Sequence, residues 1–400
     1  MWQAGILLVF VLVVFSIGKS PVFRVDRAGA AIIAAALMVA CGVLTFDEAV
    51  KCIDFRTIVI LFFMMIVIAN LKVAGFFELM GWFLARSVGS PKQLLLVTVG
   101  MSGALSAFCI NDIVCLLFTP VVLLVAKRAG CNPLPHLLGT AIASNVGSAA
   151  TLLGNPQNIL IASLSGVSFV NYFLRAFPVS VIGLLVSYFI ISFVYRKELA
   201  GFLSTHECAK VCIHKYLVYK SLFVLALVIL GYIAGVDLAL TSSLGAAFLL
   251  VTRRVEPNKI YTSIDFNLLI IFIGLFIVVG GLEQSGLMRA VVLQTENYVN
   301  FQHKTVFAAV TIVLSNLVSN VPAVMLLKYF LPPVDNMQWW TALGVFSTFA
   351  GNLTITGSIA NLIVVEIAKR NNITIGFFDY LKAGLPVTLV TSLVAFYLLS

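Results

Sequence analysis

Apolar runs of about 15 to 20 residues recur from one end of this 400-residue chain to the other. Each run is long enough to cross, as a helix, a hydrocarbon core of roughly 30 Å. Within lipid the backbone must satisfy its own hydrogen bonds, which favours helices. Because 61% of the residues are hydrophobic and only 10% are charged, no separate soluble domain is left over. We predict an all-α polytopic integral membrane protein.

About ten of these runs are predicted to be transmembrane helices. Two further apolar stretches, 93–126 and 304–331, carry polar residues in mid-segment, "SAFCIND" and "SNLVSNVP". These two are predicted to be re-entrant hairpins, which enter the membrane and return on the same side. The predicted spans are 3–18, 28–44, 56–71, 136–168, 176–195, 217–234, 238–252, 266–282, 339–368 and 383–399.

The positive charges predict the orientation of these spans. If loops 19–27, 72–92, 127–133, 196–220, 253–264 and 369–382 face the cytoplasm, they hold 19 of the 25 Lys and Arg residues. Both termini are then predicted to lie outside. The net charge of +9 follows from this loop topology, so we expect no nucleic-acid partner.

The two halves of the chain repeat. "IDFRTIVILFFMMIVIANLKVAGFF" from Ile53 matches "IDFNLLIIFIGLFIVVGGLEQSGLM" from Ile264. Asp54 is predicted to lie outside and Asp265 inside, so the copies would cross the bilayer in opposite directions. Inverted repeats of this kind are typical of secondary transporters, with the substrate site at the interface of the copies near the midplane. The predicted organisation is a first span (1–27), repeat 1 (28–195), a cytoplasmic loop (196–216) and repeat 2 (217–400).

One span in each repeat is predicted to be broken. Segment 136–168 contains "TLLGNPQN", where Asn155 is a good N-cap and Pro156 a favoured first helical residue. A helix starting near residue 137 rises roughly 15 Å by Gly147, about half the hydrocarbon thickness. In segment 339–368 Ser358 takes the cap position after Gly357.

The tips of the two predicted hairpins also carry residues that can cap the start of a helix. Asn111 or Asp112 is predicted to cap the second arm of the first hairpin, and Asn320 that of the second. Four helix N-termini would then meet near the midplane. Their free N–H groups and dipoles favour an anion, or polar oxygens generally. Ordinary kinks are the alternative, since Pro and Gly are frequent in membrane helices.

Amides and hydroxyls at matching repeat positions are the candidate substrate-binding residues. They can orient an oxyanion or supply oxygen to Na⁺, although each one could instead join helices within the bundle. Ser148, Asn352 and Thr356 are secondary candidates. The primary candidates are Asn111, Asn320, Thr151, Asn155, Asn158, Thr354, Ser358 and Asn361.

Asp112 is the only carboxylate that this map places deep in an apolar segment. A charged group there costs about 2.5 to 3.5 kcal/mol if unpaired, so a functional role is the default reading. It could bind Na⁺, exchange a proton, or only cap the hairpin arm. Asn111, Ser319 and Asn320 are predicted to join Asp112 in ion or proton coupling, and no cofactor is expected apart from bound Na⁺.

Nothing in the chain indicates an enzyme or an ATP-driven pump, since no phosphate-binding P-loop is found. One loop, "HECAKVCIH", gathers side chains that can bind zinc, but their spacing matches no strong zinc pattern and we predict no metal site. These side chains are His206, Cys208, Cys212 and His214.

"LLGNPQNILI", "TGSIANLIVV", "INDIVCLLFTP" and "SNVPAVMLL" together resemble the ion transporter superfamily. This superfamily includes divalent-anion/sodium symporters, arsenite permeases and related sodium/proton antiporters. The similarity runs from about residue 28 onward and is greatest to bacterial arsenite-permease-like anion permeases with Gly-Asn-Pro-Gln-Asn. It implies re-entrant hairpins, unwound helices at the substrate site, a scaffold domain that forms a homodimer, elevator-type movement, and a bacterial or archaeal inner membrane.

The hairpin tips depart from the dicarboxylate symporters of that superfamily. Those symporters carry Ser-Asn-Thr at both tips, whereas this chain has Ile110-Asn111-Asp112 and Ser319-Asn320-Val321. The asparagines carry over and most of the hydroxyls do not, so dicarboxylate recognition and the usual pair of sodium sites are in doubt.

The leading functional hypothesis is a secondary active transporter that moves a small inorganic or organic oxyanion or oxyacid, coupled to H⁺ or Na⁺. The alternative is a Na⁺/H⁺ antiporter that uses Asp112 and moves no anion. A third hypothesis is an ion channel on the same scaffold, against which the inverted repeat argues.

Overall fold

The computed structural model describes residues 2–18, 24–86, 89–201, 213–252, 254–296, 299–332 and 336–399. Within these ranges the chain forms α-helices and two short 3-10 helices, with no strand. The helices of the first half are α1 (Trp2–Ile17), α2 (Arg27–Ala40), α3 (Phe46–Cys52), α4 (Phe55–Val73), α5 (Phe76–Arg86), α6 (Pro91–Phe108), α7 (Asn111–Arg128), α8 (Leu134–Ser148), α9 (Pro156–Ser165) and α10 (Phe169–Val194). Those of the second half are α11 (Lys215–Ile233), α12 (Leu238–Leu250), α13 (Pro257–Tyr261), α14 (Phe266–Gln284), α15 (Leu287–Glu296), α16 (Lys304–Val318), α17 (Asn320–Leu327), η1 (Lys328–Phe330), α18 (Asn336–Ala350), η2 (Ile355–Gly357), α19 (Ile359–Arg370) and α20 (Phe377–Leu399).

Within the described ranges, five helices are long and apolar enough to cross a membrane: α4, α10, α11, α14 and α20. Helices α1, α2, α12 and α16 are apolar but shorter. Large apolar side chains face outward, such as Phe193 on α10, Tyr219 on α11 and Phe248 on α12. An apolar exterior is what a lipid surrounding requires. The all-helical membrane fold class is therefore confirmed, while the number of spans and the re-entrant hairpins stay predictions.

Several elements differ from the sequence-based expectation, and α20, for example, begins at Phe377 rather than near 383. Helix α10 begins at Phe169 rather than near 176, because Ser168 caps it by accepting the N–H of Asn171, and the helix continues through Pro178. Helix α3 was not expected. It forms because Thr45 and Glu48 make a reciprocal capping box, which stabilises even a short polar helix.

Helices of the two halves pack in a crossed arrangement. Helix α2 of the first half packs against α14, and α12 of the second half packs against α4. Helix α1 packs on α2, as α11 packs on α12. These matching pairs are what two copies of one unit would form, provided that α1 is counted as part of the first copy. The opposite orientation of the copies in the membrane stays a prediction.

Helix α8 is the most enclosed element, since every residue from Pro135 to Ser148 is buried. It packs closely along α6, where a Cβ placed on Gly147 would lie only 2.2 Å from the carbonyl oxygen of Gly103. Glycine at this position lets the two backbones touch, a common device in membrane helix packing. The close approach brings the end of α8 against the α6–α7 pair.

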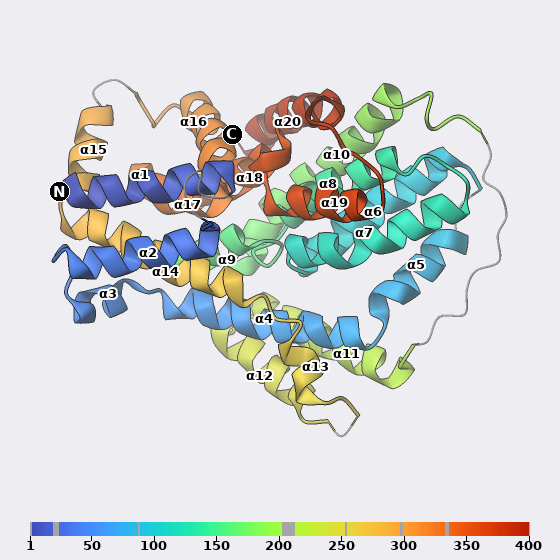
Figure 1. Cartoon of the computed structure of the whole chain (residues 1–400), viewed down its shortest axis with the longest axis horizontal. Helices are drawn as coiled ribbons and strands as arrows, with labels where there is room; N and C mark the ends of the chain where they lie inside the picture. Colours follow the sequence, from blue (N-terminus) through green and yellow to red (C-terminus); the bar gives the residue numbers. More distant parts are fainter. Residues whose placement is uncertain are drawn as a thin grey trace.

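Both predicted helix breaks are present. The first lies between α8 and α9, and the second lies between α18 and α19, with η2 inside it. Figure 1 shows α8, α9, α18 and α19 near the middle of the molecule, with α7 reaching this region from the right and α17 from the left. The fold therefore gathers both broken helices and the starts of α7 and α17 in one central region.

Candidate functional site

Each broken helix is held by one asparagine in the same way. The Nδ2 group of Asn158 donates to the carbonyl oxygens of Ser148 (3.2 Å) and Thr151 (2.9 Å). In the second half the Nδ2 group of Asn361 donates to those of Gly351 (2.7 Å) and Thr354 (3.2 Å). These carbonyls have lost helical partners at the break, and a buried unpaired carbonyl is costly. The two amides therefore stabilise the breaks themselves.

The cap residues of the broken helices reach across to the other half. The Nδ2 group of Asn155 donates to Thr348 Oγ1 at 3.1 Å, and Ser358 Oγ donates to Asn145 Oδ1 at 3.1 Å. Asn155 also caps α9, because its Oδ1 accepts the N–H of Asn158 at 3.1 Å. Ser358 occupies the N-cap position of α19 but makes no side-chain cap bond. Its hydroxyl instead makes the hydrogen bond to Asn145 in the other half.

Asn145 lies at the centre of this amide cluster. Its Nδ2 group donates to Asn352 Oδ1 (2.9 Å) and Asn361 Oδ1 (3.1 Å). Its Oδ1 accepts from Asn111 Nδ2 (3.0 Å) as well as from Ser358. One fully buried side chain thus joins α7, α8 and the break before α19. We call the set of Asn111, Asn145, Asn352, Ser358 and Asn361 the central amide cluster.

The start of α17 approaches the second break. A Cβ placed on Gly351 would lie 3.4 Å from Asn320 Nδ2, and Asn316 Nδ2 donates to the carbonyl of Ala350 at 3.1 Å. Thr354 Oγ1 donates to Asn316 Oδ1 at 3.2 Å. Ser319, which joins α16 to α17, has a backbone φ of 75°, and residues other than glycine rarely adopt this conformation.

The start of α7 approaches the first break in a related way. The backbone N–H of Asn111 donates to the carbonyl of Gly154 at 2.9 Å. Thr151 Oγ1 donates to the carbonyl of Ala107 and accepts the N–H of Leu153 at 3.1 Å. The predicted primary candidates therefore all lie at the two breaks or at the starts of α7 and α17. Whether they bind substrate stays a prediction.

The predicted caps at the starts of α7 and α17 are wrong. The N-cap positions are Ile110 and Ser319, and neither makes a side-chain cap bond. Asn111 and Asn320 are the first helical residues, and the Asn111 amide is drawn to Asn145 instead. At Asn111 a hydrogen bond to a distant residue, Asn145, forms in place of the local cap.

Three side-chain carbonyls of the candidate residues keep acceptor capacity. Within the described residues, Asn111 Oδ1, Asn158 Oδ1 and Asn320 Oδ1 are buried and accept no hydrogen bond, while the Nδ2 group of Asn352 donates none. Buried polar groups normally have partners, so these unpaired atoms are candidate contacts for a ligand or water. Amide oxygens suit a cation, and an N–H suits an anion.

Asp112 follows Asn111 and is half-buried. Its carboxylate lies against the backbone N–H of Ala360, in the first turn of α19, and it interacts electrostatically with Asp265 and Arg27. The Asp112 carboxylate thus occupies the positive end of α19, where an anion is stabilised.

Sequence reasoning missed several residues of this region. Asn145 and Thr348 stand at equivalent positions of the two halves, as do Tyr172 and Tyr380, and both tyrosines are fully buried. Tyr172 lies against Asn158, and Tyr380 against Asn361. The repeat alignment was the signal that could have found these pairs, because it places a polar residue at the same point of each copy.

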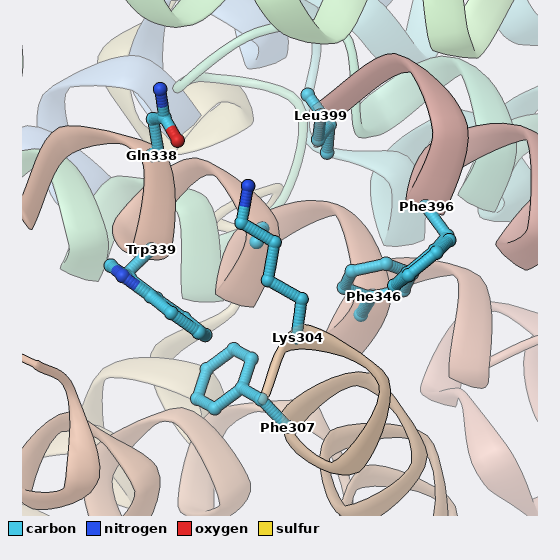
Figure 2. Close-up of a pocket in the computed structure, with 8 residues that line it drawn as sticks. Lys304, Phe307, Gln338, Trp339, Phe346, Phe396 and Leu399 are labelled. Atoms are coloured by element: carbon cyan, nitrogen blue, oxygen red, sulfur yellow. The ribbon is translucent and has the colours of Figure 1, made fainter. Parts of the chain in front are cut away.

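A separate pocket, shown in Figure 2, lies between α16, α18 and α20. Phe307, Trp339, Phe346 and Phe396 line it with Lys304. It holds about 10 Å³, room for a single water molecule. None of the predicted site residues lines this pocket, so we do not assign it to the substrate.

The predicted weak zinc candidates His206, Cys208 and Cys212 lie outside the described residues. The backbone N–H of His214 donates to the carbonyl of Ala74 at 3.1 Å. Within the described part of the chain, no group of three or more His, Cys, Asp or Glu side chains could hold a metal ion.

Comparison with known proteins identifies the family. The family described as citrate transporter (CitMHS) matches residues 10–337. The 46 kDa membrane protein of Mycobacterium leprae is 31% identical over 397 residues, covering 92% of each chain. The silicon efflux transporter LSI3 of Oryza sativa subsp. japonica is 28% identical, covering 93% of this chain and 92% of its own.

A solved structure supports the fold. The YdaH transporter of Alcanivorax borkumensis has a TM-score of 0.60 and 15% sequence identity, covering 100% of this chain and 96% of its own. The superfamily resemblance stated from the sequence motifs is confirmed by these matches. The chain belongs to the citrate transporter family and is a membrane transporter, not an enzyme.

Proposed function

We propose that this protein is a secondary active transporter for a small oxyanion or oxyacid, coupled to H⁺ or Na⁺. The substrate site lies between the starts of α7 and α17 and the two broken helices. The observation that carries the proposal is the central amide cluster, which joins both broken helices through Asn145. Uncharged amides and helix N-termini bind oxygen-rich solutes without a fixed basic residue.

The names of the relatives agree with this substrate class. The family is named for citrate and the rice relative for silicon efflux. Citrate is a carboxylate oxyanion, and dissolved silicon at neutral pH is an uncharged oxyacid. Both substrates present several oxygens to a site and differ in charge. We therefore propose the class, an oxygen-rich anion or acid, rather than one member.

Asp112 offers a physical basis for coupling. Its carboxylate competes with an anionic substrate for the positive end of α19. A proton or Na⁺ on Asp112 removes its negative charge and frees that helix end for the substrate. Binding of the coupling ion and of the substrate then favour each other, which is the reciprocal linkage that coupled transport requires.

The movement and assembly of the protein belong to the same proposal. The two hairpins and the broken helices move as one body against the crossed helices α2, α4, α12 and α14, in an elevator motion. The inverted repeat, the homodimer, the external termini and a bacterial or archaeal inner membrane are also proposed. Lipid surrounds the exposed apolar faces of α10, α11 and α12.

A Na⁺/H⁺ antiporter without an anion substrate is the second candidate. The observation that favours it is the pair of unpaired amide oxygens on Asn111 and Asn320, together with the nearby Asp112 carboxylate. Oxygen ligands of this kind suit Na⁺. Dissipation of a pH gradient by Na⁺ in anion-free vesicles would support this second function over the first.

The test uses the full chain reconstituted in proteoliposomes. Uptake of citrate, silicic acid and arsenite is measured under pH and Na⁺ gradients, with Asn111→Ala and Asn320→Ala as variants. We expect both variants to abolish transport while the purified protein stays monodisperse. Asn70→Ala is the matched control, because Asn70 is buried in α4 and, among the described residues, donates to the Ile66 carbonyl of its own helix. Unchanged transport by both variants would remove the site from this region.

A further inference from the structure

A second cavity lies beside the start of α7. It holds about 50 Å³, room for a few water molecules, and lies between α4, α7, α19 and the start of α14. Its polar lining consists of Lys72, Asp112, Ser263 and Asp265, and the remaining lining residues are apolar. Asp265 is exposed, whereas Asp112 is half-buried. The cavity therefore connects an exposed carboxylate with a deeper one.

The charges on this cavity favour a cation. It carries two carboxylates and one ammonium group, and neither carboxylate has an ion-pair partner within 4 Å in the described part of the chain. Asp265 accepts the N–H of Leu268 at 3.2 Å as the cap of α14. A narrow cleft with excess negative charge concentrates cations and repels anions.

Two further groups near Asp112, Arg27 and Cys115, do not change the excess negative charge on the cavity lining. Arg27 acts on Asp112 electrostatically from outside the cavity, where its guanidinium donates to the carbonyl of Phe15 at 3.1 and 2.9 Å. Cys115 lies one turn along α7 from Asp112 and is bonded to Ser144 at 3.0 Å. Neither Arg27 nor Cys115 lines the cavity.

The equivalent place in the other half is packed differently. Repeat alignment pairs Ser263 with Cys52, Ala69 with Gly280, and Lys72 with Glu283. A Cβ placed on Gly280 would lie 2.2 Å from Cys52 Sγ, so these two residues fill the space between them. The Tyr329 hydroxyl also donates to Glu283 Oε2 at 2.7 Å. Among the described residues, the contact of Cys52 with Gly280 thus narrows the related place, and Val321 stands there at the position of Asp112.

We propose that this cavity is the path by which a monovalent cation, H⁺ or Na⁺, reaches Asp112, and that Asp265 gives the path its preference for positive charge. The inference rests on the proposed coupling role of Asp112 and adds a specificity residue to it. On the predicted orientation, the cavity opens to the cytoplasm. The transported anion enters elsewhere, because the two carboxylates oppose it.

Charge-selective thiol labelling tests the proposal without a transported substrate. Ser263→Cys is introduced into a full chain whose native cysteines are replaced by serine. Two methanethiosulfonates of similar size are applied, one with a trimethylammonium group and one with a sulfonate group. Relative to their rates with a free thiol, we expect the cationic reagent to react about tenfold faster. Adding Asp265→Asn should reduce that ratio by about threefold or more.

The repeat supplies matched controls. Asp54→Asn removes the carboxylate that corresponds to Asp265, and the ratio should not change. A chain that keeps only Cys52, the counterpart of Ser263, should react much more slowly with both reagents. Ala69→Cys replaces Ser263→Cys as the reporter if the latter variant is not monodisperse, because Ala69 lines the same cavity.

The outcomes separate this inference from the transport proposal. Equal rates for the two reagents, or a ratio that Asp265→Asn leaves unchanged, would overturn the cation path even if transport is measured. A preserved charge preference with no transport of any oxyanion would leave the path standing and remove the proposed substrate class. Slower labelling in NaCl than in N-methylglucamine chloride assigns the path to Na⁺ rather than H⁺.

Discussion

At the scale of single residues, Asn145 and Thr348 show how the two halves differ at equivalent positions. Both are fully buried and both accept a bond from the cap residue of the opposite half. The amide of Asn145 can also donate, so it holds Asn352 and Asn361 as well. The hydroxyl of Thr348 instead accepts a second bond, from Gln157 at 3.2 Å. The central amide cluster is therefore asymmetric although the halves are related.

Asn145→Ala should destabilise the protein markedly. The change leaves buried polar groups of Asn111, Asn352, Ser358 and Asn361 without this partner, and each such group costs about 1 to 3 kcal/mol. We expect a clear fall in the melting temperature of the purified protein in detergent. Thr348→Val, which removes one acceptor, should cause a smaller fall. An equal effect of the two changes would contradict the central place given to Asn145.

The sequence alone was enough to identify most of these residues, but not their partners. Asn155 and Pro156 are a local cap signal, and the structure has a helix start there. Asn145 carries no local signal, because an asparagine in a helix gains its role only from groups that pack against it. Its partners Asn352 and Asn361 come from the other half of the chain, so no local pattern could assign these bonds.

At the scale of elements, the approach of α6 to α8 fixes where the first break lies. Gly147 contacts the backbone at Gly103, next to the end of α8. Hydropathy predicted both segments, and the Gly-Asn-Pro motif predicted the break. It could not predict the separation of the two helices, since that depends on side-chain volume at the contact.

Gly147→Ala should force α6 and α8 apart. The added Cβ would meet the Gly103 backbone, which cannot move aside as a side chain can. We expect a loss of about 1 to 3 kcal/mol, measured as a lower melting temperature, with reduced transport. Gly100→Ala on α6 is the matched control, because a Cβ there would meet nothing within 4 Å. If Gly147→Ala is as stable as Gly100→Ala, the close contact is not needed.

At the scale of the whole molecule, the halves depend on each other. Helix α2 packs on α14, α4 packs on α12, and each cap residue bonds to the opposite half. The superfamily and the all-helical fold could be predicted from sequence motifs and apolar runs. The crossed packing could not, because it joins segments roughly 200 residues apart, and sequence patterns report local structure.

Chains divided within 202–212 should therefore assemble only when both parts are present. Each part alone would leave buried amides and crossed helix faces without partners. We expect the co-expressed parts to purify as one complex and each single part to aggregate. Affinity purification through a tag on one part measures this. A monodisperse, helical first part on its own would contradict the dependence.

The reciprocal bonds of Asn155 and Ser358 also have a consequence for biosynthesis. A ribosome that adds about 5 to 20 residues per second takes on the order of 10 to 40 s to travel from Asn155 to Thr348. During that interval Asn145 and Asn155 belong to a nascent chain whose later hydrogen-bond partners have not yet been made. The nascent first half must keep these amides hydrated, or sheltered by the insertion machinery, until the later helices emerge.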